Sequence, residues 1–372
     1  MSRKSETPAD RRDGRCETHY IESCKADEAA VCECICQGYN TGDQRGQSET
    51  YVQCDPLLSD ADDAVPPETV EHYLDRWLQS MRHSVGKSTY ANYDGLIRRH
   101  IVPAIGQIPL DAINSSTIQR CINQKLASGR LDGKGGLSAK TARDIVGLLK
   151  RSLHAAGIEL NITLPKYSLP KLRVLTKQEQ RALIAAAQTS GNAESLGVLL
   201  SLFTGVRIGE LCSLKWNDVS FQEGVLKVNK TLQRIENCES DQKQKTIIEL
   251  GTPIHKESIR NVPLAPFLLY ELAQYKGAAH DDDYILSGSC RYVEPRLCQY
   301  RFKKLVKSAG IDDINFNTLR HTFAARCLEL QIDAKTISKL LGYSNCNTIL
   351  DRYAQPSREC QQDSLEKLSH FL

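Results

Sequence analysis

The sequence predicts a mainly helical protein with a small antiparallel β-sheet, an α+β fold, and three observations support this. From position 68 onward, apolar residues recur at spacings of three and four along most of the chain, as in amphipathic helices. Three β-branched runs of alternating character lie together between positions 225 and 264. The chain has 372 residues, more than one hydrophobic core usually serves, so we expect two domains.

The first 66 residues are expected to be an acidic, unstructured leader. They show no sustained apolar period and end in DPLLSDADDAVPP, an acidic, proline-terminated stretch. Residues 1–64 hold 7 Lys+Arg and 14 Asp+Glu, a balance of −7, whereas the other 308 hold 41 and 31, a balance of +10. The basic remainder permits a phosphate-rich partner, although charged faces are often simply solvated.

Targeting and metal-binding signals in the leader are weak. The first residues, MSRKSETPADRRDGR, lack the apolar stretch of a secretory signal, and no run of about 18 apolar residues occurs in the chain. We therefore expect a cytoplasmic protein with reduced thiols and no membrane segment. Six leader residues could ligate zinc: Cys16, His19, Cys24, Cys32, Cys34 and Cys36. Zinc ligands usually come in pairs with a two-residue gap, which this run lacks, so a disordered tail is the alternative.

Residues 67–158 are expected to form one helical domain. Its first helix carries apolar residues at helical spacing from Val70 to Met81. Ser88 and Ser138 are expected as the N-caps of the second and fourth helices, and the glycine loop SGRLDGKGG precedes the fourth. The four helices are expected at residues 68–81, 88–101, 110–126 and 138–157.

Residues 159–173, with two prolines, are expected to be an extended linker to a second domain that spans residues 174–372. Thr176, with Glu179 three residues on, has the capping-box pattern of a helix start. Strands are expected in VLKVNKTLQRI, KTIIELG and IRNVPL. Further helices are expected at residues 193–203, 207–214, 265–275, 295–309, 318–330, 334–341 and 344–353.

Two arginines and one tyrosine of this second domain suggest phosphate chemistry. Arg207 opens a helix after Gly205, Arg320 lies near another helix start, and Tyr353 lies close to a helix end. Two guanidinium groups could clamp a phosphate, and a tyrosine hydroxyl could attack its phosphorus. Spacing alone leaves the structural alternatives open, because Glu210 could simply pair with Arg207 on one helical face.

Four segments of this domain resemble the boxes of the tyrosine recombinase family, the integrases of phages and conjugative elements: TGVRIGEL, SIRNVPL, TLRHTFA and LLGYSNCNTILDRY. Two earlier segments resemble the family's helical, SAM-like core-binding domain: STYANYDGLIRRHIVPAIGQIPLDAI and SGRLDGKGGLSAKTARDI. The resemblance covers residues 67–356. It implies a clamp, with a core-binding domain on one face of duplex DNA and a tyrosine-recombinase catalytic domain on the other.

The resemblance implies site-specific recombination that integrates or excises a mobile element. By position, Arg207 and Arg320 would hold the scissile phosphate, and Tyr353 would form a 3′-phosphotyrosyl link while releasing a 5′-hydroxyl. The phosphodiester energy is conserved in this reaction, so neither a cofactor nor a metal is implied. The implied partners are double-stranded DNA and the other copies of a homotetramer, and a directionality factor cannot be named.

Three positions depart from the family pattern. Asn317 stands where the family usually has histidine, and asparagine cannot serve as a base at neutral pH. Tyr343 replaces a histidine or tryptophan, and Ile254 replaces the lysine that protonates the leaving oxygen. Lys256 is the candidate substitute for that lysine, and the alternative is that no residue replaces it. Because several missing groups could silence the enzyme, the alternatives are a non-catalytic DNA-binding relative and, with the same chemistry, a type IB topoisomerase.

One histidine and three basic residues have expected roles beside or outside the catalytic boxes. His321 follows Arg320 as in the family, and a helical step of about 100° turns it away, so we interpret it as a buried supporting histidine. Lys134, Lys140 and Arg143 lie around a glycine loop and a helix start, where they are candidate phosphate contacts. A solvated face is the alternative for these three.

Overall fold

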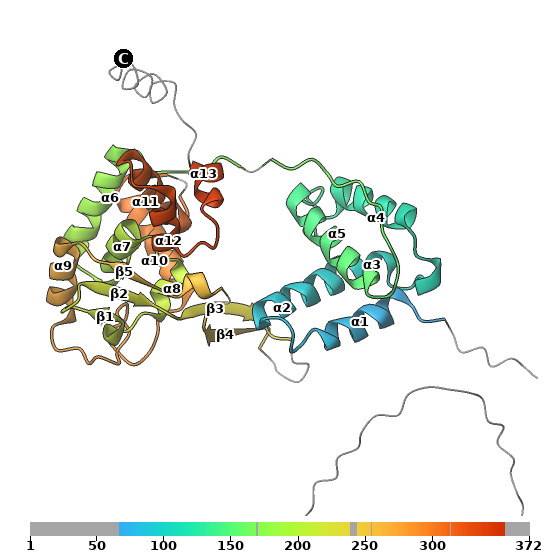
Figure 1. Ribbon diagram of the computed structural model, residues 1–372, viewed down its shortest axis with the longest axis horizontal. Helices are drawn as coiled ribbons and strands as arrows, with labels where there is room; N and C mark the ends of the chain where they lie inside the picture. Colours follow the sequence, from blue (N-terminus) through green and yellow to red (C-terminus); the bar gives the residue numbers. More distant parts are fainter. Residues whose placement is uncertain (1–66, 169, 239–243, 254, 313, 354–372) are drawn as a thin grey trace, which may run out of the picture. The chain divides into compact units, whose positions relative to one another are not determined.

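The computed structural model describes most of the chain beyond its N-terminal leader (Figure 1). Among the described residues, no helix is long and apolar enough to cross a membrane. The leader with its six candidate zinc ligands, the C-terminal residues 354–372 and Ile254 lie outside the described residues. The described ranges are 67–168, 170–238, 244–253, 255–312 and 314–353.

Residues 67–158, called here the helical part, contain the four predicted helices, although the third begins at Ser115 and not at position 110. Their apolar faces share one core, with Val70, Leu74, Ile97, Ile118 and Leu149 almost fully buried. The elements are α1 (Val70–Ser80), α2 (Lys87–Leu96), the π-helix η1 (Ile97–Ile101), α3 (Val102–Ile105), the 3₁₀ turn η2 (Leu110–Ala112), α4 (Ser115–Ser128) and α5 (Ala139–His154).

Two details of the second predicted helix are wrong, whereas the fourth begins as expected. Ser138 accepts a hydrogen bond from Thr141 N and caps α5, which confirms that N-cap. Ser88 lies inside α2, which begins at Lys87 after an extended Gly86. The helical path also does not stop at Ile101, because η1 leads directly into α3, whose first turn tolerates a proline.

Residues 174–353, called here the C-terminal part, are mainly helical around a second core. Thr176 and Glu179 form the predicted capping box at the start of α6. The helices are α6 (Lys177–Ser190), α7 (Ala193–Thr204), α8 (Ile208–Ser213), α9 (Pro266–Lys276), α10 (Pro295–Ser308), α11 (Asn317–Glu329), α12 (Ala334–Leu341) and α13 (Asn347–Tyr353), with 3₁₀ turns η3 (Trp216–Asp218) and η4 (Lys256–Ser258). The boundaries at 66/67 and 173/174 stay predictions.

The strands of the C-terminal part confirm the antiparallel prediction but correct its grouping. They are β1 (Val219–Ser220), β2 (Val225–Val228), β3 (Thr231–Glu236), β4 (Thr246–Gly251) and β5 (Arg260–Pro263). The run at 225–235 is two strands rather than one, because β2 pairs with β1 and β5 while β3 pairs only with β4. The pairing changes at residues 229 and 230, which belong to neither strand: Val228 pairs with Arg260, whereas Thr231 pairs with Gly251.

The last three described helices, orange to red in Figure 1, pack around a small apolar cluster. Ala324 and Cys327 of α11, Ile337 and Leu341 of α12, and Ile349 of α13 form its buried centre. Two tyrosines, Tyr343 and Tyr353, pack against it. Local packing therefore fixes where the tyrosine at the end of α13 lies.

Candidate active site

Arg320 is a buried arginine that joins three helices. Its side chain on α11 donates from Nη1 to the Gly205 carbonyl at 2.7 Å and from Nη2 to the Leu341 carbonyl at 2.7 Å. Gly205 ends α7 with φ 66°, and a side chain there would collide with Leu341 and Phe323. Burial, and then the charge of Arg207, lower the pKa of Arg320, so this cation is held in place at an electrostatic cost.

Arg207 is held by a carboxylate that also binds a second arginine. Its side chain donates to Glu210 Oε1 at 2.7 Å, and its backbone N–H donates to Glu210 Oε2 at 2.9 Å. Arg260 of β5 binds the same carboxylate at 2.9 and 3.2 Å and donates to the Leu340 carbonyl at 2.6 Å. Burial works to raise the pKa of Glu210, but Arg260 and Arg207 hold it below its ordinary value.

Tyr343 brings the two predicted phosphate-binding arginines together. Its ring centre lies 4.7 Å from Arg320 Cζ and 5.6 Å from Arg207 Cζ, within cation–π range of both. Burial would raise the pKa of this tyrosine, but the charge and hydrogen bond of Arg320 and the charge of Arg207 hold it below its ordinary value. The ring therefore occupies the space beside both guanidinium groups.

Tyr353, the last described residue of α13, is half-buried and touches His321. Its Oη lies 2.6 Å from His321 Nδ1, and the two ring centres are 5.8 Å apart. Burial and the neighbouring Tyr343 raise the pKa of the Tyr353 phenol. Burial, together with the charges of Arg320 and Arg352, lowers the pKa of His321 to about 4. The predicted buried supporting histidine is therefore half-buried and in direct contact with the predicted nucleophile.

The Tyr353 cluster, defined as Arg207, Arg320, His321, Tyr343 and Tyr353, gathers four of the six predicted catalytic residues and adds His321. Sequence reasoning gave His321 no chemical role. One signal could have found it, since His321 lies four residues after Asn317 and therefore on the same face of α11. Asn317 itself is exposed at the first position of α11.

Lys256 lies on η4, and its side chain is exposed. This turn packs against Gly342, because a side chain at Gly342 would meet Glu257 O and Ser258 Cα at 3.0 Å. Gly342 has φ 69° and immediately precedes Tyr343. The segment that carries Lys256 is therefore placed against the turn that carries Tyr343.

The three predicted phosphate contacts of the helical part are all exposed. Lys140 Nζ donates to Asp144 Oδ2 at 2.7 Å, an ion pair one helical turn apart. Arg143 Nη1 donates to the Pro165 carbonyl at 3.1 Å, and Lys134 lies in the glycine loop. Their contact with DNA stays a prediction.

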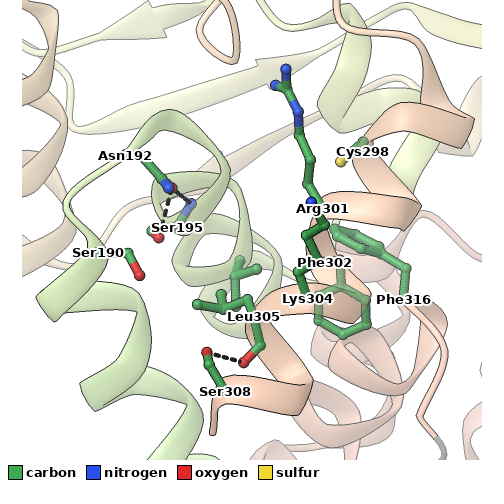
Figure 2. Close-up of a pocket in the computed structure, with 11 residues that line it drawn as sticks. Ser190, Asn192, Ser195, Cys298, Arg301, Phe302, Lys304, Leu305, Ser308 and Phe316 are labelled. Atoms are coloured by element: carbon green, nitrogen blue, oxygen red, sulfur yellow. Dashed lines mark hydrogen bonds between the residues drawn. The ribbon is translucent and has the colours of Figure 1, made fainter.

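A cavity of 530 Å³ lies between the α6–α7 turn and α10, where Asn192 accepts hydrogen bonds from Ser195 N and Oγ (Figure 2). Figure 2 shows the Arg301 guanidinium directed away from Ser190 and Ser308. None of the cavity's lining residues belongs to the Tyr353 cluster. We therefore assign it no part in the chemistry. Within the described ranges, no group of three or more His, Cys, Asp or Glu side chains is arranged to hold a metal ion.

Family models match the chain in both parts. The description "Phage integrase family" fits residues 173–359, and "Phage integrase, N-terminal SAM-like domain" fits residues 69–126. Among relatives, a "Tyrosine recombinase XerC-like" protein of Caldanaerobacter subterraneus is 25% identical over 81% of this chain and 83% of its own. The "Tyrosine recombinase XerA" of Pyrococcus furiosus is 30% identical over 57% of this chain and 69% of its own.

Solved structures share the fold at low identity. The Tn1549 transposon integrase, in complex with a circular intermediate DNA, matches with a TM-score of 0.62 and 18% identity over 80% of this chain and 99% of that chain. A lambda integrase tetramer bound to a Holliday junction matches with a TM-score of 0.55 and 21% identity over 79% and 80%. At these identities, the likeness speaks for the fold alone.

The site and the matches together define a class of protein, one that breaks and rejoins DNA strands at a phosphodiester. The chain belongs to the phage integrase family, the tyrosine recombinases, and its function is site-specific recombination of DNA. The α+β fold with a SAM-like helical part is confirmed.

Proposed function

We propose that this chain is a catalytically competent recombinase despite its unusual residues at positions 317, 343 and 254. Tyr353 cleaves one strand of double-stranded DNA, forms a 3′-phosphotyrosyl link and releases a 5′-hydroxyl. Four copies on two duplexes exchange strands and thereby integrate or excise a mobile element. The matched integrases carry a circular intermediate DNA and a Holliday junction in their structures, which supports this proposal by analogy. We expect the reaction in the cytoplasm.

One observation carries the proposal: two arginines lie against the Tyr343 ring, and the neighbouring Tyr353 hydroxyl contacts a histidine nitrogen. Each guanidinium has five N–H donors, and the two carbonyl bonds of Arg320 engage only two of them. The Arg207 side chain is 37% exposed, so it can meet a phosphate from solvent. Both cations would stabilise the oxygens that gain charge as the phosphorus is attacked.

Fixed geometry is the second support for competence. Glu210 neutralises part of the charge of Arg207 and Arg260, so the buried side of the site is compensated before DNA arrives. Tyr343 can donate its hydroxyl to a phosphate oxygen as the usual histidine or tryptophan N–H would. Preorganised groups of this kind cost little reorganisation during the reaction.

A covalent trap tests the proposal. Duplexes that bind the full chain are first selected from a random-sequence library by gel shift. The selected sequence is then synthesised with nicks near each candidate cleavage point, so that a short 5′-hydroxyl fragment diffuses away and the protein stays attached. We expect a denaturation-resistant adduct with the wild-type chain. We expect none with Tyr353→Phe, which should still shift the duplex.

The outcomes separate the alternatives. If the wild-type chain shifts the duplex but forms no adduct at any nick position, the proposal of an active enzyme is overturned. A non-catalytic DNA-binding protein is then supported. Relaxation of supercoiled plasmid without site preference, by wild type but not by Tyr353→Phe, would instead indicate a topoisomerase. If the protein shifts the selected duplex and a duplex of scrambled sequence equally well, this would contradict site-specific recombination.

A further inference from the structure

We infer that His321 is a catalytic residue that takes the proton of the Tyr353 hydroxyl when Tyr353 attacks DNA. The inference rests on the proposed function and adds a role to a residue outside the positions at which the resemblance implied one. It also answers how the site can work with Asn317 in place of a histidine. The base has moved one helical turn along α11, from position 317 to position 321.

The contact between the two side chains meets the geometric requirement for a general base. A base must lie within about 2.6–3.2 Å of the atom whose proton it takes, and Nδ1 lies 2.6 Å from Oη. In the neutral tautomer with its proton on Nε2, Nδ1 presents a lone pair to the hydroxyl. The hydroxyl then donates along the direction in which its proton would leave.

Packing holds this contact in place. Tyr353 rests on the apolar cluster of α11, α12 and α13, and His321 lies on α11 beside the fully buried Thr322. Asn317 occupies the same helical face one turn earlier but is exposed. The histidine four residues on is therefore the member of this face that contacts the nucleophile.

The protonation states suit a base before the reaction begins. With a pKa of about 4, His321 is neutral at pH 7 and free to accept a proton. The charged and titratable groups around it are two arginines, two tyrosines and, lining a cavity with Tyr353, one lysine and one aspartate: Arg320, Arg352, Tyr343, Tyr353, Lys171 and Asp351.

A bound phosphate would strengthen this base. Two of the causes that lower the pKa of His321 are the positive charges of Arg320 and Arg352. A phosphate anion held by Arg320 would offset part of that charge and raise the pKa of the imidazole. The histidine would thus become more basic only when substrate occupies the site.

The step balances in atoms and electrons. The O–H bond of Tyr353 breaks as its proton passes to His321 Nδ1, and the oxygen's electron pair forms the bond to phosphorus. The bond from phosphorus to the 5′-oxygen breaks, and that oxygen gains a proton from Lys256 or from water. In rejoining, the 5′-hydroxyl gives its proton back to Lys256 or to water as its oxygen bonds to phosphorus, the bond from phosphorus to Tyr353 breaks, and His321 returns its proton to the Tyr353 oxygen.

The experiment measures single-turnover adduct formation on the selected, nicked duplex from about pH 4 to pH 9, so that the series reaches the pKa of His321, about 4. His321→Asn keeps a hydrogen-bond acceptor beside Tyr353 but cannot take up a proton, and we expect a loss of about 10²- to 10⁴-fold. His321→Gln serves as a second variant, and His280→Asn, at an exposed histidine, is the matched control. Gel shift and thermal unfolding verify that each variant folds and binds DNA.

A chemical rescue separates proton transfer from mere positioning. A fluorotyrosine at position 353 has a more acidic phenol and needs less help from a base. It should restore much of the His321→Asn rate while changing the wild-type rate little. The variant should also lose the wild-type decline in rate at low pH, because a base works only when it is unprotonated and so fails below its pKa.

If the wild-type chain forms the adduct and both His321 variants form it at the same rate, the inference is overturned. A loss that fluorotyrosine does not relieve would also overturn it, because the histidine would then be a structural support. Neither result touches the proposed function, because the catalytic competence of the wild type is judged by its own adduct.

Discussion

The Tyr353 cluster and the exposed basic residues contrast in how their charges are held. Arg320 is 3% exposed and is fixed by two backbone carbonyls, and Arg207 shares a buried carboxylate with Arg260. Lys134 and Lys256, by contrast, are exposed on a glycine loop and a short turn. The fold therefore sets the geometry of the first group, whereas the second would take its final position from bound DNA.

Only the groups that meet the reacting phosphate need a fixed geometry. Groups that meet the reacting phosphate must be in place before the transition state, and several protein contacts hold each of them. Groups that meet the DNA backbone need only charge and reach. We expect substitutions in the buried group to act on rate and folding, and those in the exposed group to act on leaving-group protonation or on salt-dependent binding.

Arg320 should show the largest effect. An arginine that stabilises a transferring phosphoryl group contributes about 10³–10⁵ in rate, so we expect Arg320→Lys to slow adduct formation by that order. A lysine retains the charge, but it presents its donors from one nitrogen and cannot reproduce the planar fork whose Nη1 and Nη2 bind the Gly205 and Leu341 carbonyls. Single-turnover trapping measures the loss, and Arg181→Lys, at an exposed position on α6, is the control.

Folding must be checked for the same variant, because an unsatisfied buried carbonyl costs about 1–3 kcal/mol. Urea unfolding separates lost stability from lost rate. If Arg320→Lys forms adduct as fast as the wild type while remaining folded, the planar guanidinium is not needed and the contrast between the two groups weakens.

Lys256 tests whether an exposed residue can take part in the chemistry. We expect Lys256→Ala to slow cleavage of an ordinary duplex by about 10²–10⁴-fold, because the leaving 5′-oxygen loses its proton donor. A duplex with sulfur at that bridging position needs no proton and should be cleaved at nearly the wild-type rate. Equal losses on both substrates would remove the general-acid role. Lys307→Ala, on the exposed face of α10, is the control.

A substitution of Glu210 tests how much the buried ion pairs contribute to the stability of the fold. We expect Glu210→Gln to lower the free energy of unfolding by about 3–5 kcal/mol at pH 7, since Arg260, with a side chain 5% exposed, loses its carboxylate partner. The folded-state pKa of Glu210 is depressed, so its contribution is present above its ordinary pKa and is lost as the pH falls through the folded value.

The pH dependence supplies the check on that assignment. In urea unfolding, the difference between wild type and Glu210→Gln should shrink as the pH is lowered toward 3. Glu223→Gln, at an exposed position, should leave the unfolding midpoint almost unchanged at every pH. A difference that stays constant with pH would show that packing around Glu210, rather than its charge, carries the effect.

Local features of this fold could be predicted from the sequence, because their causes lie within a few residues. The Ser138 cap and the Thr176–Glu179 capping box each depend on groups three residues apart. The Ser88 cap failed because the chain is already helical at Lys87. Strand grouping failed for a different reason, since the partner of Val228 is Arg260 and not a residue of the following strand.

The sequence predicted several residues of the candidate site, but it did not predict which of them touch one another. Arg207, Arg320 and Tyr353 came from the resemblance, and the structure brings all three to one place. The contact between His321 and Tyr353 spans 32 residues and depends on how α13 packs on α11, which no spacing rule gives. The family pattern directed attention to position 317 and away from the histidine one turn later.

Substitutions of the basic residues in the helical part should have the smallest effects. They test directly whether exposed charges contribute to DNA binding alone. Each phosphate contact changes the slope of log affinity against log salt by about 0.9, so Lys134→Ala should flatten the slope by that amount and weaken binding alike on all sequences. Lys140 is paired with Asp144, so DNA must compete with a carboxylate for it, and Lys140→Ala should change the slope less.

Asp144→Asn tests that reason for the smaller Lys140 effect. With the pair removed, Lys140 is released to bind phosphate, and binding should tighten and become steeper in salt. Gel shifts on the selected duplex across a salt series measure all three variants. If Lys134→Ala leaves the slope unchanged, the glycine loop does not contact the backbone. If Asp144→Asn also has no effect, the exposed charges of α5 are a solvated face, and recognition must lie with other basic residues of the chain.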